Sequence, residues 1–448
     1  MTNDMTVGKP VSSILKMALP VMLGNLFQQF YSMADTMIVG RCLGRNALAA
    51  VGATSSIYSL ILWFSTGCTG GFAIILAQKF GAGRYDALRK KLALSILLSS
   101  AITVIVTFFS LLSLGGILRL MHTPSEILPD AESYIFIILA GLFATIAYNM
   151  SASVLRAMGD GKTPLYFLIL TSFLNIFLDL MFIQVFHMGT GGAAAATVLS
   201  QAVSALLCVL YMRSHFPILH LRRDDWKQTA ADAADMLRLG LPMGLMGAVT
   251  ASGIIILQFA INSFGTAAVA AYTSAARVEQ VFEQILGAFS VTMSNYCGQN
   301  YGAGKTDRIR KGVRQSWLLM FAAAVLFILI VETAGGFILG QFLSQKDASV
   351  ISMATEYLRI VALFLPAFGT IMIFRSSIQG MGNASVPMLN GIIESACRAL
   401  WTLYLIRFGT FHQLCLVNPT AWTIASVILI IIYRRHMRKL TQISQISS

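Results

Sequence analysis

Two stretches of the chain decide its fold: Gly44-Arg45-Asn46-Ala47-Leu48-Ala49-Ala50-Val51 and, 221 residues later, Gly265-Thr266-Ala267-Ala268-Val269-Ala270-Ala271-Tyr272. Each is followed by a Gly-Ala-Gly turn, Gly81-Ala82-Gly83 in the first half and Gly302-Ala303-Gly304 in the second. The interval from the first glycine to this turn is 37 residues in both halves. The chain is therefore an internal duplication, which is typical of secondary transporters that handle substrate between two repeated helical halves.

The composition places most of the chain in lipid. Of its 448 residues 56% are hydrophobic and only 11% are charged, with a mean hydropathy of +0.73, whereas a soluble domain carries roughly 25% charged residues. The net charge of +13 does not indicate a nucleic-acid partner, because the basic residues form short clusters between apolar runs. The six cysteines are scattered without CxxC spacing, so we expect neither disulfides nor a structural metal.

Apolar runs long enough to span a membrane as helices, about 20 residues each, occur twelve times. They cover roughly 14–40, 47–78, 92–119, 131–158, 164–187, 191–213, 237–263, 268–298, 312–342, 350–379, 387–410 and 412–434. We therefore predict an all-α integral membrane protein with a six-helix bundle at 1–213, a polar linker at 214–236, and a second six-helix bundle with a tail at 237–448. An even number of helices per half makes the repeats parallel, related by a pseudo-two-fold axis along the membrane normal.

The distribution of lysine and arginine predicts the orientation. The connection 79–91 contains five basic residues, and the equivalent connection 305–314 in the second half also contains five. The linker and the tail (434–439) add basic residues to the same side. By the positive-inside rule this side and both termini are cytoplasmic, in a multi-pass protein of the plasma membrane.

Charged side chains inside a membrane are costly, about 2.5–3.5 kcal/mol each on insertion scales, and are candidates for function. Asp35, Asn175, Asp179 and Thr197 fall in one layer of the outer leaflet, roughly 7–18 Å deep at 1.5 Å per helical residue. Carboxylates in this place can exchange protons, and the same carboxylate, amide and hydroxyl oxygens suit a sodium ion. We interpret the four residues as an ion-coupling site. The alternative for Asp35 is that it caps the end of the first helix.

The second half does not repeat this site. By the repeat offset, Asn175 corresponds to Arg398, Asp179 to Thr402, and Asp35 to Ile256 or its neighbour. Ion coupling is therefore expected in the first half alone.

Other charges occur in the second half. Glu394 and Arg398, four residues apart, are interpreted as an intrahelical ion pair. Glu279 and Glu283 share a helix face without an intrahelical cation, so with Gln280 between them they are candidate contacts for a cationic substrate. The alternative is that these residues are structural.

At this point the chain resembles the multidrug and toxic compound extrusion (MATE) transporters. The similarity lies in Met33-Ala34-Asp35-Thr36-Met37-Ile38-Val39-Gly40-Arg41, in Asn175 to Asp179, in Gly192 to Gln201 and in Gly298-Gln299-Asn300-Tyr301-Gly302-Ala303, and it covers about residues 10–440. The resemblance implies two bundles around a central cavity, export by antiport, and a coupling role for Asp35, Asn175 and Asp179. One departure is that Leu241 to Gly253 contains no acidic residue, whereas another branch of the family has one there, which argues against a sodium site in the C-terminal half.

We therefore expect a monomeric efflux transporter without a cofactor, which exports lipophilic organic cations and other drugs in exchange for H⁺ or Na⁺ by alternating access. Its other contacts are membrane lipids. The alternative is a flippase for a lipid or a lipid-linked saccharide. An enzyme is not expected, because five of the six histidines lie in or next to loops and the sixth lies in the tail, without HxxxH pairing.

Overall fold

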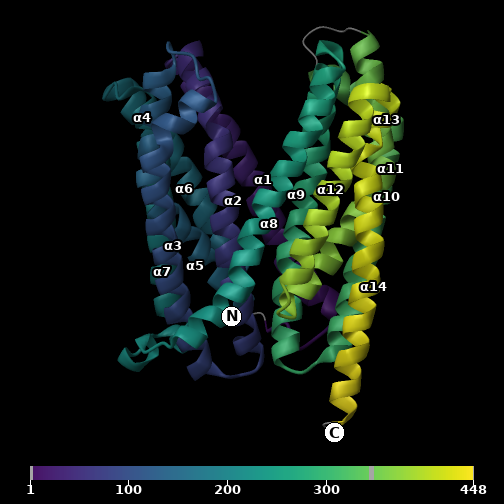
Figure 1. The fold of residues 1–448 in the computed structure, drawn as a ribbon. Coiled ribbons are helices and arrows are strands. Elements are labelled where there is room, and N and C mark those ends of the chain that lie inside the picture. Colours follow the sequence, from purple (N-terminus) through teal and green to yellow (C-terminus); the bar gives the residue numbers. More distant parts are fainter. Residues whose placement is uncertain (1–3, 343–347, 447–448) are drawn as a thin grey trace. The chain divides into compact units, whose positions relative to one another are not determined.

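The computed structural model describes residues 4–342 and 348–446, and within these ranges every regular element is a helix. The long helices (Figure 1) are α1 (Pro10–Cys42), α2 (Arg45–Gly81), α3 (Tyr85–Leu120), α4 (Leu128–Ala140), α5 (Leu142–Ala157), α6 (Lys162–Leu180), α7 (Gly189–His215), α8 (Ala230–Ser263), α9 (Thr266–Gly302), α10 (Thr306–Phe342), α11 (Ala348–Gly380), α12 (Ser385–Phe408) and α14 (Val417–Ile446). Short pieces are η1 (Met181–Val185), η2 (Pro217–Leu219), η3 (Arg223–Trp226) and α13 (Phe411–Cys415). Each of the twelve predicted spans coincides with a helix or with two consecutive helices, so the predicted all-α membrane fold is confirmed.

Two of the twelve predicted spans, α9 and α12, are more polar than the others because they contain charged residues. In the described residues, nine helices are long and apolar enough to span a membrane alone, and the pair α4 and α5 makes a tenth. Helices α9 and α12 do not pass this test. Helix α9 carries Glu279 and Glu283, and α12 carries Glu394 and Arg398. Their polarity is expected for helices that keep part of their surface away from lipid.

The structure corrects the predicted spans in two places. The span predicted at 131–158 is broken at Gly141, where α4 and α5 meet at a bend of 46°. The span predicted at 164–187 ends as an α-helix at Leu180 and continues as the π-helical segment η1.

Several helices also begin before their apolar runs. Helix α3 begins at Tyr85, α10 at Thr306 and α8 at Ala230, six or seven residues earlier than predicted. Their first turns contain charged residues, so these helices extend beyond the apolar layer, and α8 begins within the predicted linker.

The helices form two compact units with the same internal arrangement. The first unit is built on Leu19–Gly244, and the second on Met5–Ala18 together with the chain from Leu245 onward. In the first unit α2 packs on α3 and α5, and α7 packs on α5 and α6. In the second unit α9 packs on α10 and α11, and α14 packs on α11 and α12. The equivalent helices thus make equivalent contacts, as a duplicated sequence requires.

The repeated glycines have a common conformational cause. Gly44 and Gly265 precede α2 and α9 with φ of 85° and 87°, and Gly83 and Gly304 occupy the following turns with φ of 66° and 69°. Side chains other than glycine rarely adopt these positive φ values. The glycines recur in the sequence because each half of the chain has the same two tight turns, which require positive φ.

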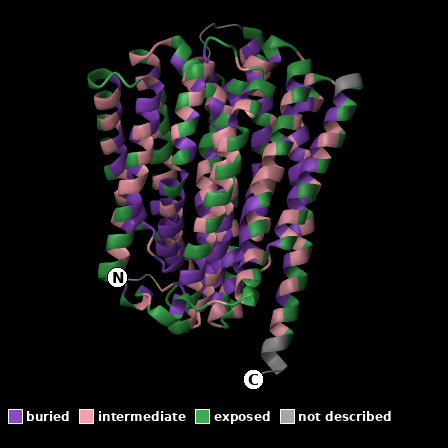
Figure 2. Ribbon diagram, turned by 60° about the vertical axis from the view of Figure 1, so that its left-hand side comes forward, coloured by how far each residue is buried: buried purple, intermediate pink, exposed green. Residues whose placement is uncertain are grey.

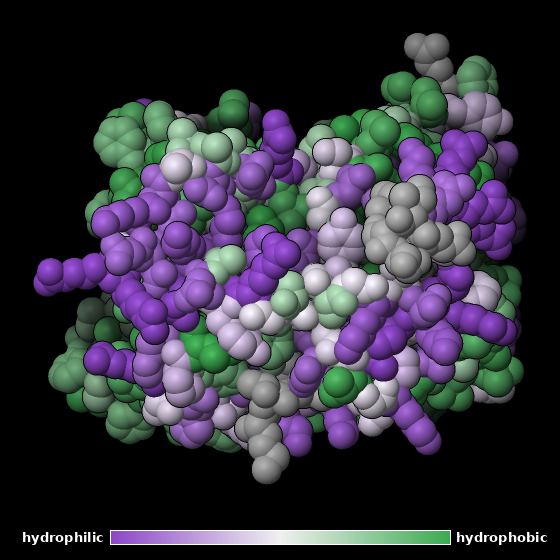
Figure 3. All heavy atoms as spheres, turned by 90° about the horizontal axis from the view of Figure 1, so that it is seen from below, coloured by the Kyte–Doolittle hydropathy of each residue, from purple (hydrophilic) through white to green (hydrophobic). Residues whose placement is uncertain are grey.

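In each unit the basic connections gather at one end, which we call the basic end. In the first unit the Lys91 ammonium lies 2.7 Å from the Asp232 carboxylate, which ties the first turns of α3 to the first turn of α8. In the second unit Arg308 of α10 donates to the backbone carbonyls of Met5, Val7 and Gly8, so that Met5–Gly8 is held on the α9–α10 turn. Seen from below, hydrophilic residues gather over these ends (Figure 3). Exposed residues, green in Figure 2, run along the lengths of the helices among buried ones, as lipid-facing surfaces require.

Candidate functional site

The four residues of the predicted ion-coupling site lie together in the first unit. Asn175 and Asp179 are one turn apart on α6, and both are fully buried. In the amide orientation that satisfies both of its ends, Asn175 Nδ2 donates to Asp179 Oδ2 at 2.8 Å, and its Oδ1 accepts from the backbone N–H of Thr197 at 3.2 Å. Asp35 of α1 lies within hydrogen-bonding reach of Asp179. Three helices thus converge on one polar cluster.

Asp35 and Asp179, the carboxyl pair, have no neutralising cation among the residues that the structure describes. Oδ1 of each carboxyl group is buried and has no donor among the described residues. Neither group forms an ion pair with a lysine or arginine in that part of the chain. Two facing carboxylates accept hydrogen bonds only, so their contact is stable when a proton or a cation lies between them.

Three tyrosines that the sequence reasoning missed surround the carboxyl pair. Tyr31 and Tyr134 interact electrostatically with both carboxyl groups, and both also interact with Tyr58. The Tyr31 hydroxyl is hydrogen-bonded to the Thr197 side chain. Tyr31 precedes Asp35 by four residues on α1, and this spacing was a signal in the sequence. Tyr58 and Tyr134 stand in apolar runs, where nothing in the sequence distinguishes them from packing residues.

An apolar cluster beside the site fixes the three helices. Val39, Ile183 and Ala193 pack together, and each lies four residues from a site residue on its own helical segment. They follow Asp35, follow Asp179 and precede Thr197, respectively. Residues four apart share a helix face, so the packing of these apolar side chains positions the polar ones.

Small residues and an irregular turn bring α7 close to α6. The π-helical segment η1 begins two residues after Asp179, and π turns are frequent at functional sites. A Cβ on Gly192 of α7 would lie 3.1 Å from Phe182 Cβ of η1, a distance that only a small residue permits. The Gly- and Ala-rich start of α7 thus places Thr197 beside Asn175.

The second unit contains a polar cluster of different character. Arg398 Nη2 lies 2.6 Å from Glu394 Oε1, with both side chains buried, and Arg398 Nε donates to Asn418 Oδ1 at 2.9 Å. The predicted intrahelical ion pair is therefore confirmed. Glu279 of α9 is buried nearby, and its Oε2 accepts from the Tyr357 hydroxyl at 3.4 Å.

The structure separates the three residues that were predicted as substrate contacts. Glu279 faces the interior of the second unit, whereas Glu283 and Gln280 are exposed. Glu279 and Glu283 still interact electrostatically with each other and with Arg398. Glu283 is therefore the acidic residue of this cluster whose side chain is exposed.

Within the second unit, the residues at the positions equivalent to Asp35, Asn175 and Asp179 also lie close together, but their chemistry differs. In the second unit Thr402 Oγ1 lies 3.5 Å from the backbone oxygen of Ile256, and Arg398 is one turn away from Thr402. Where the first unit has two facing carboxyl groups, the second has a guanidinium group already paired with Glu394. The described residues contain no group of three or more His, Cys, Asp or Glu side chains that could hold a metal ion.

Comparison with known proteins supports the duplication and assigns the family. The MatE family model matches residues 20–181 and, a second time, residues 242–402. The chain belongs to the MatE family. Its members are transporters and not enzymes.

Alignments with individual relatives extend over most of the chain. One is the "probable multidrug resistance protein YpnP" of Bacillus subtilis, 28% identical, in an alignment that covers 85% of this chain and 84% of the relative. Another is the "probable multidrug resistance protein NorM" of Thermotoga maritima, 27% identical, with 93% and 89% covered. A solved structure described as the outward-facing conformation of a multidrug resistance MATE family transporter has the same fold. Its TM-score is 0.91 at 21% identity, with 98% of both chains covered.

Proposed function

We propose that this protein exports lipophilic organic cations in exchange for protons, and that Asp35 and Asp179 carry the coupled proton. The observation that carries the proposal is the contact between two carboxyl groups that have no cationic partner among the described residues. A shared proton is the simplest group that stabilises such a contact. The names of these relatives, both called probable multidrug resistance proteins, support drugs as substrates.

Coupling requires that substrate and proton favour different conformations of the transporter. Protonation of the carboxyl pair removes one negative charge from a buried layer and permits its hydrogen bond. Loss of that proton leaves two facing carboxylates, which repel each other and draw in water. We propose that this difference changes the packing of α1 against α6 and α7, and that proton entry at this site drives drug release by alternating access.

We further propose that Glu283 contacts the cationic substrate in the second unit, with Glu279 behind it. The exposed carboxylate attracts an organic cation, and the aromatic residues nearby, among them Tyr272 and Tyr357, offer apolar contact. The basic ends and both termini are proposed to lie in the cytoplasm of a cell whose plasma membrane contains the protein.

The test is transport in everted membrane vesicles with proton and sodium gradients imposed separately. Wild-type protein should accumulate an organic cation such as ethidium under a proton gradient, and Asp35→Asn and Asp179→Asn should each lose this transport while remaining folded. The control Glu126→Gln removes an exposed carboxylate and should transport normally. Transport by both Asp→Asn variants at the wild-type rate would refute the coupling role, and transport under a sodium gradient alone would replace the proton by sodium.

The substrate role of Glu283 has a separate readout. Glu283→Gln should weaken transport of a cationic drug more than transport of a neutral one, because only the cation loses an electrostatic contact. Equal losses for both drugs would mean that Glu283 is structural.

A further inference from the structure

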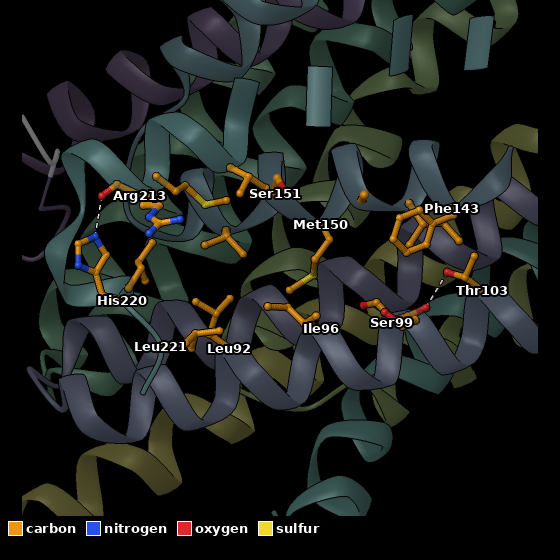
Figure 4. A pocket seen from close by; sticks show the side chains of 17 residues that line it. Leu92, Ile96, Ser99, Thr103, Phe143, Met150, Ser151, Arg213, His220 and Leu221 are labelled. Atoms are coloured by element: carbon orange, nitrogen blue, oxygen red, sulfur yellow. Dashed lines mark hydrogen bonds between the residues drawn. The ribbon is translucent and has the colours of Figure 1, made fainter. Parts of the chain in front are cut away.

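A groove of about 720 Å³ lies in the first unit between α3, α5 and α7, and none of its lining residues belongs to the ion-coupling site. Its walls are mainly apolar and include Leu92, Ile96, Met150, Val154 and Val209. In Figure 4 the groove is elongated, with Arg213 and His220 at one end and Phe143 and Thr103 at the other.

The length of the groove matches one leaflet of a membrane. It extends from Leu92 to Thr103 along α3 and from Val154 to Phe143 along α5. Eleven helical steps correspond to roughly 17 Å at 1.5 Å per residue, and one leaflet of the hydrocarbon core is roughly 15 Å thick. Leu92 and Val154 stand near the basic end, so the groove begins at the surface there and ends near the middle of the membrane.

The groove is open along its side. Ile96, Phe143 and Val209 line it and have exposed fractions of 37%, 63% and 47%. In a membrane protein, exposed apolar side chains of this size contact acyl chains. A hydrocarbon chain can therefore enter from the bilayer without passing through water.

A free cation stands at the basic end of the groove. Arg213 is exposed in the last turn of α7 and forms no ion pair within the described residues. His220 Nε2 lies 2.6 Å from the backbone oxygen of Arg213, and it must donate, because a carbonyl only accepts. This bond folds residues 219–221 over the end of α7 and keeps Arg213 at the mouth. Arg222 and Arg223 follow directly in the sequence.

We infer that this groove binds an anionic phospholipid from the leaflet at the basic end, with one acyl chain along α3 and α5 and the phosphate on Arg213. Basic pockets between membrane helices recognise anionic lipid headgroups through this combination of apolar groove and cationic mouth. A cationic drug fits the groove less well, because Arg213 repels it. The inference does not depend on the proposed function.

The test is native mass spectrometry of the delipidated full-length protein with phosphatidylglycerol and phosphatidylethanolamine of identical chains. Wild-type protein should bind one phosphatidylglycerol in preference to phosphatidylethanolamine. Arg213→Ala should reduce that preference roughly fivefold, the ratio that corresponds to about 1 kcal/mol for one basic residue at an anionic surface. Ser99→Phe, which fills the groove from α3, should reduce binding of both lipids.

Matched controls distinguish this site from general attraction of lipid. Arg435→Ala removes an exposed arginine of α14, and Ser113→Phe adds a ring to an exposed position of α3 outside the groove. Both should bind lipid as the wild type does. Unchanged phosphatidylglycerol binding in Arg213→Ala, or an equal loss in Arg435→Ala, would overturn the inference. Loss of ethidium binding in Ser99→Phe, with lipid binding unchanged, would also overturn the inference.

Discussion

Replacing Arg398 by methionine should destabilise the second unit, because it leaves the buried Glu394 carboxylate without its ion-pair partner. The side chains of Arg398 and Glu394 are only 7% and 8% exposed and lie 2.6 Å apart. Arg398 also donates to Asn418. The same unit offers a matched control in Arg359 and Glu332, which lie 3.1 Å apart but are 49% and 44% exposed.

The expected magnitudes follow from this difference in burial. Removing one partner of a buried ion pair costs about 3–5 kcal/mol, whereas an exposed pair contributes about 0–1 kcal/mol. For a unit of roughly 200 residues, 1 kcal/mol corresponds to about 2–4 °C in the midpoint of thermal unfolding. Arg398→Met should therefore lower the midpoint by roughly 6–20 °C, and Arg359→Met by no more than about 4 °C.

The assay is thermal unfolding of the detergent-solubilised protein, followed by the loss of the monodisperse peak in size-exclusion chromatography. The double variant Glu394→Met/Arg398→Met should recover most of the lost stability, because a well-packed apolar pair can replace a buried ion pair. The reasoning is refuted if Arg398→Met unfolds at the wild-type temperature, or if the double variant is less stable than Arg398→Met.

Two further predictions concern packing and the held N-terminal segment. Gly71→Ala on α2 should destabilise the first unit by about 1–3 kcal/mol, because the new Cβ would lie 2.7 Å from Gly240 Cα of α8. Gly52→Ala on the same helix meets nothing within 4 Å and should be neutral or stabilising by up to about 1 kcal/mol; thermal unfolding of both variants checks the pair, and equal midpoints would contradict it. Arg308→Ala should raise hydrogen exchange at Met5–Gly8 by roughly tenfold or more, since charged hydrogen bonds contribute about 1.5–3 kcal/mol each. Lys311→Ala, an exposed change on the same helix, should leave that exchange unaltered, and unchanged exchange in Arg308→Ala would show that the segment is held by other contacts.

The sequence predicted the spans and the grouping of the four polar residues, because both depend on spacing along a helix. The apolar runs set the positions of the twelve spans, and the four-residue spacing of Asn175 and Asp179 places both on one face. The same spacing predicted the Glu394–Arg398 pair. Estimated depth from the membrane surface then predicted that Asp35 and Thr197 lie beside them, and the structure places both residues there.

The features that the sequence did not predict depend on contacts between helices, which residue spacing along one helix does not reveal. Tyr58 and Tyr134 reach the carboxyl pair from helices where aromatic residues also pack against lipid. At the break between α4 and α5, the Val198 side chain of α7 occupies the space that a Cβ on Gly141 would need. Gln280 was grouped with Glu279 because they are neighbours in sequence, but adjacent residues on a helix point in different directions.

The central claim is that the carboxyl pair holds a proton that leaves when substrate binds. The direct measurement is proton release from the purified protein in weakly buffered detergent solution, followed with a pH-sensitive dye while an organic cation is added. The wild type should release about one proton per bound cation, and Asp35→Asn/Asp179→Asn should bind the cation without releasing any. Equal proton release from the wild type and the double variant would contradict the claim.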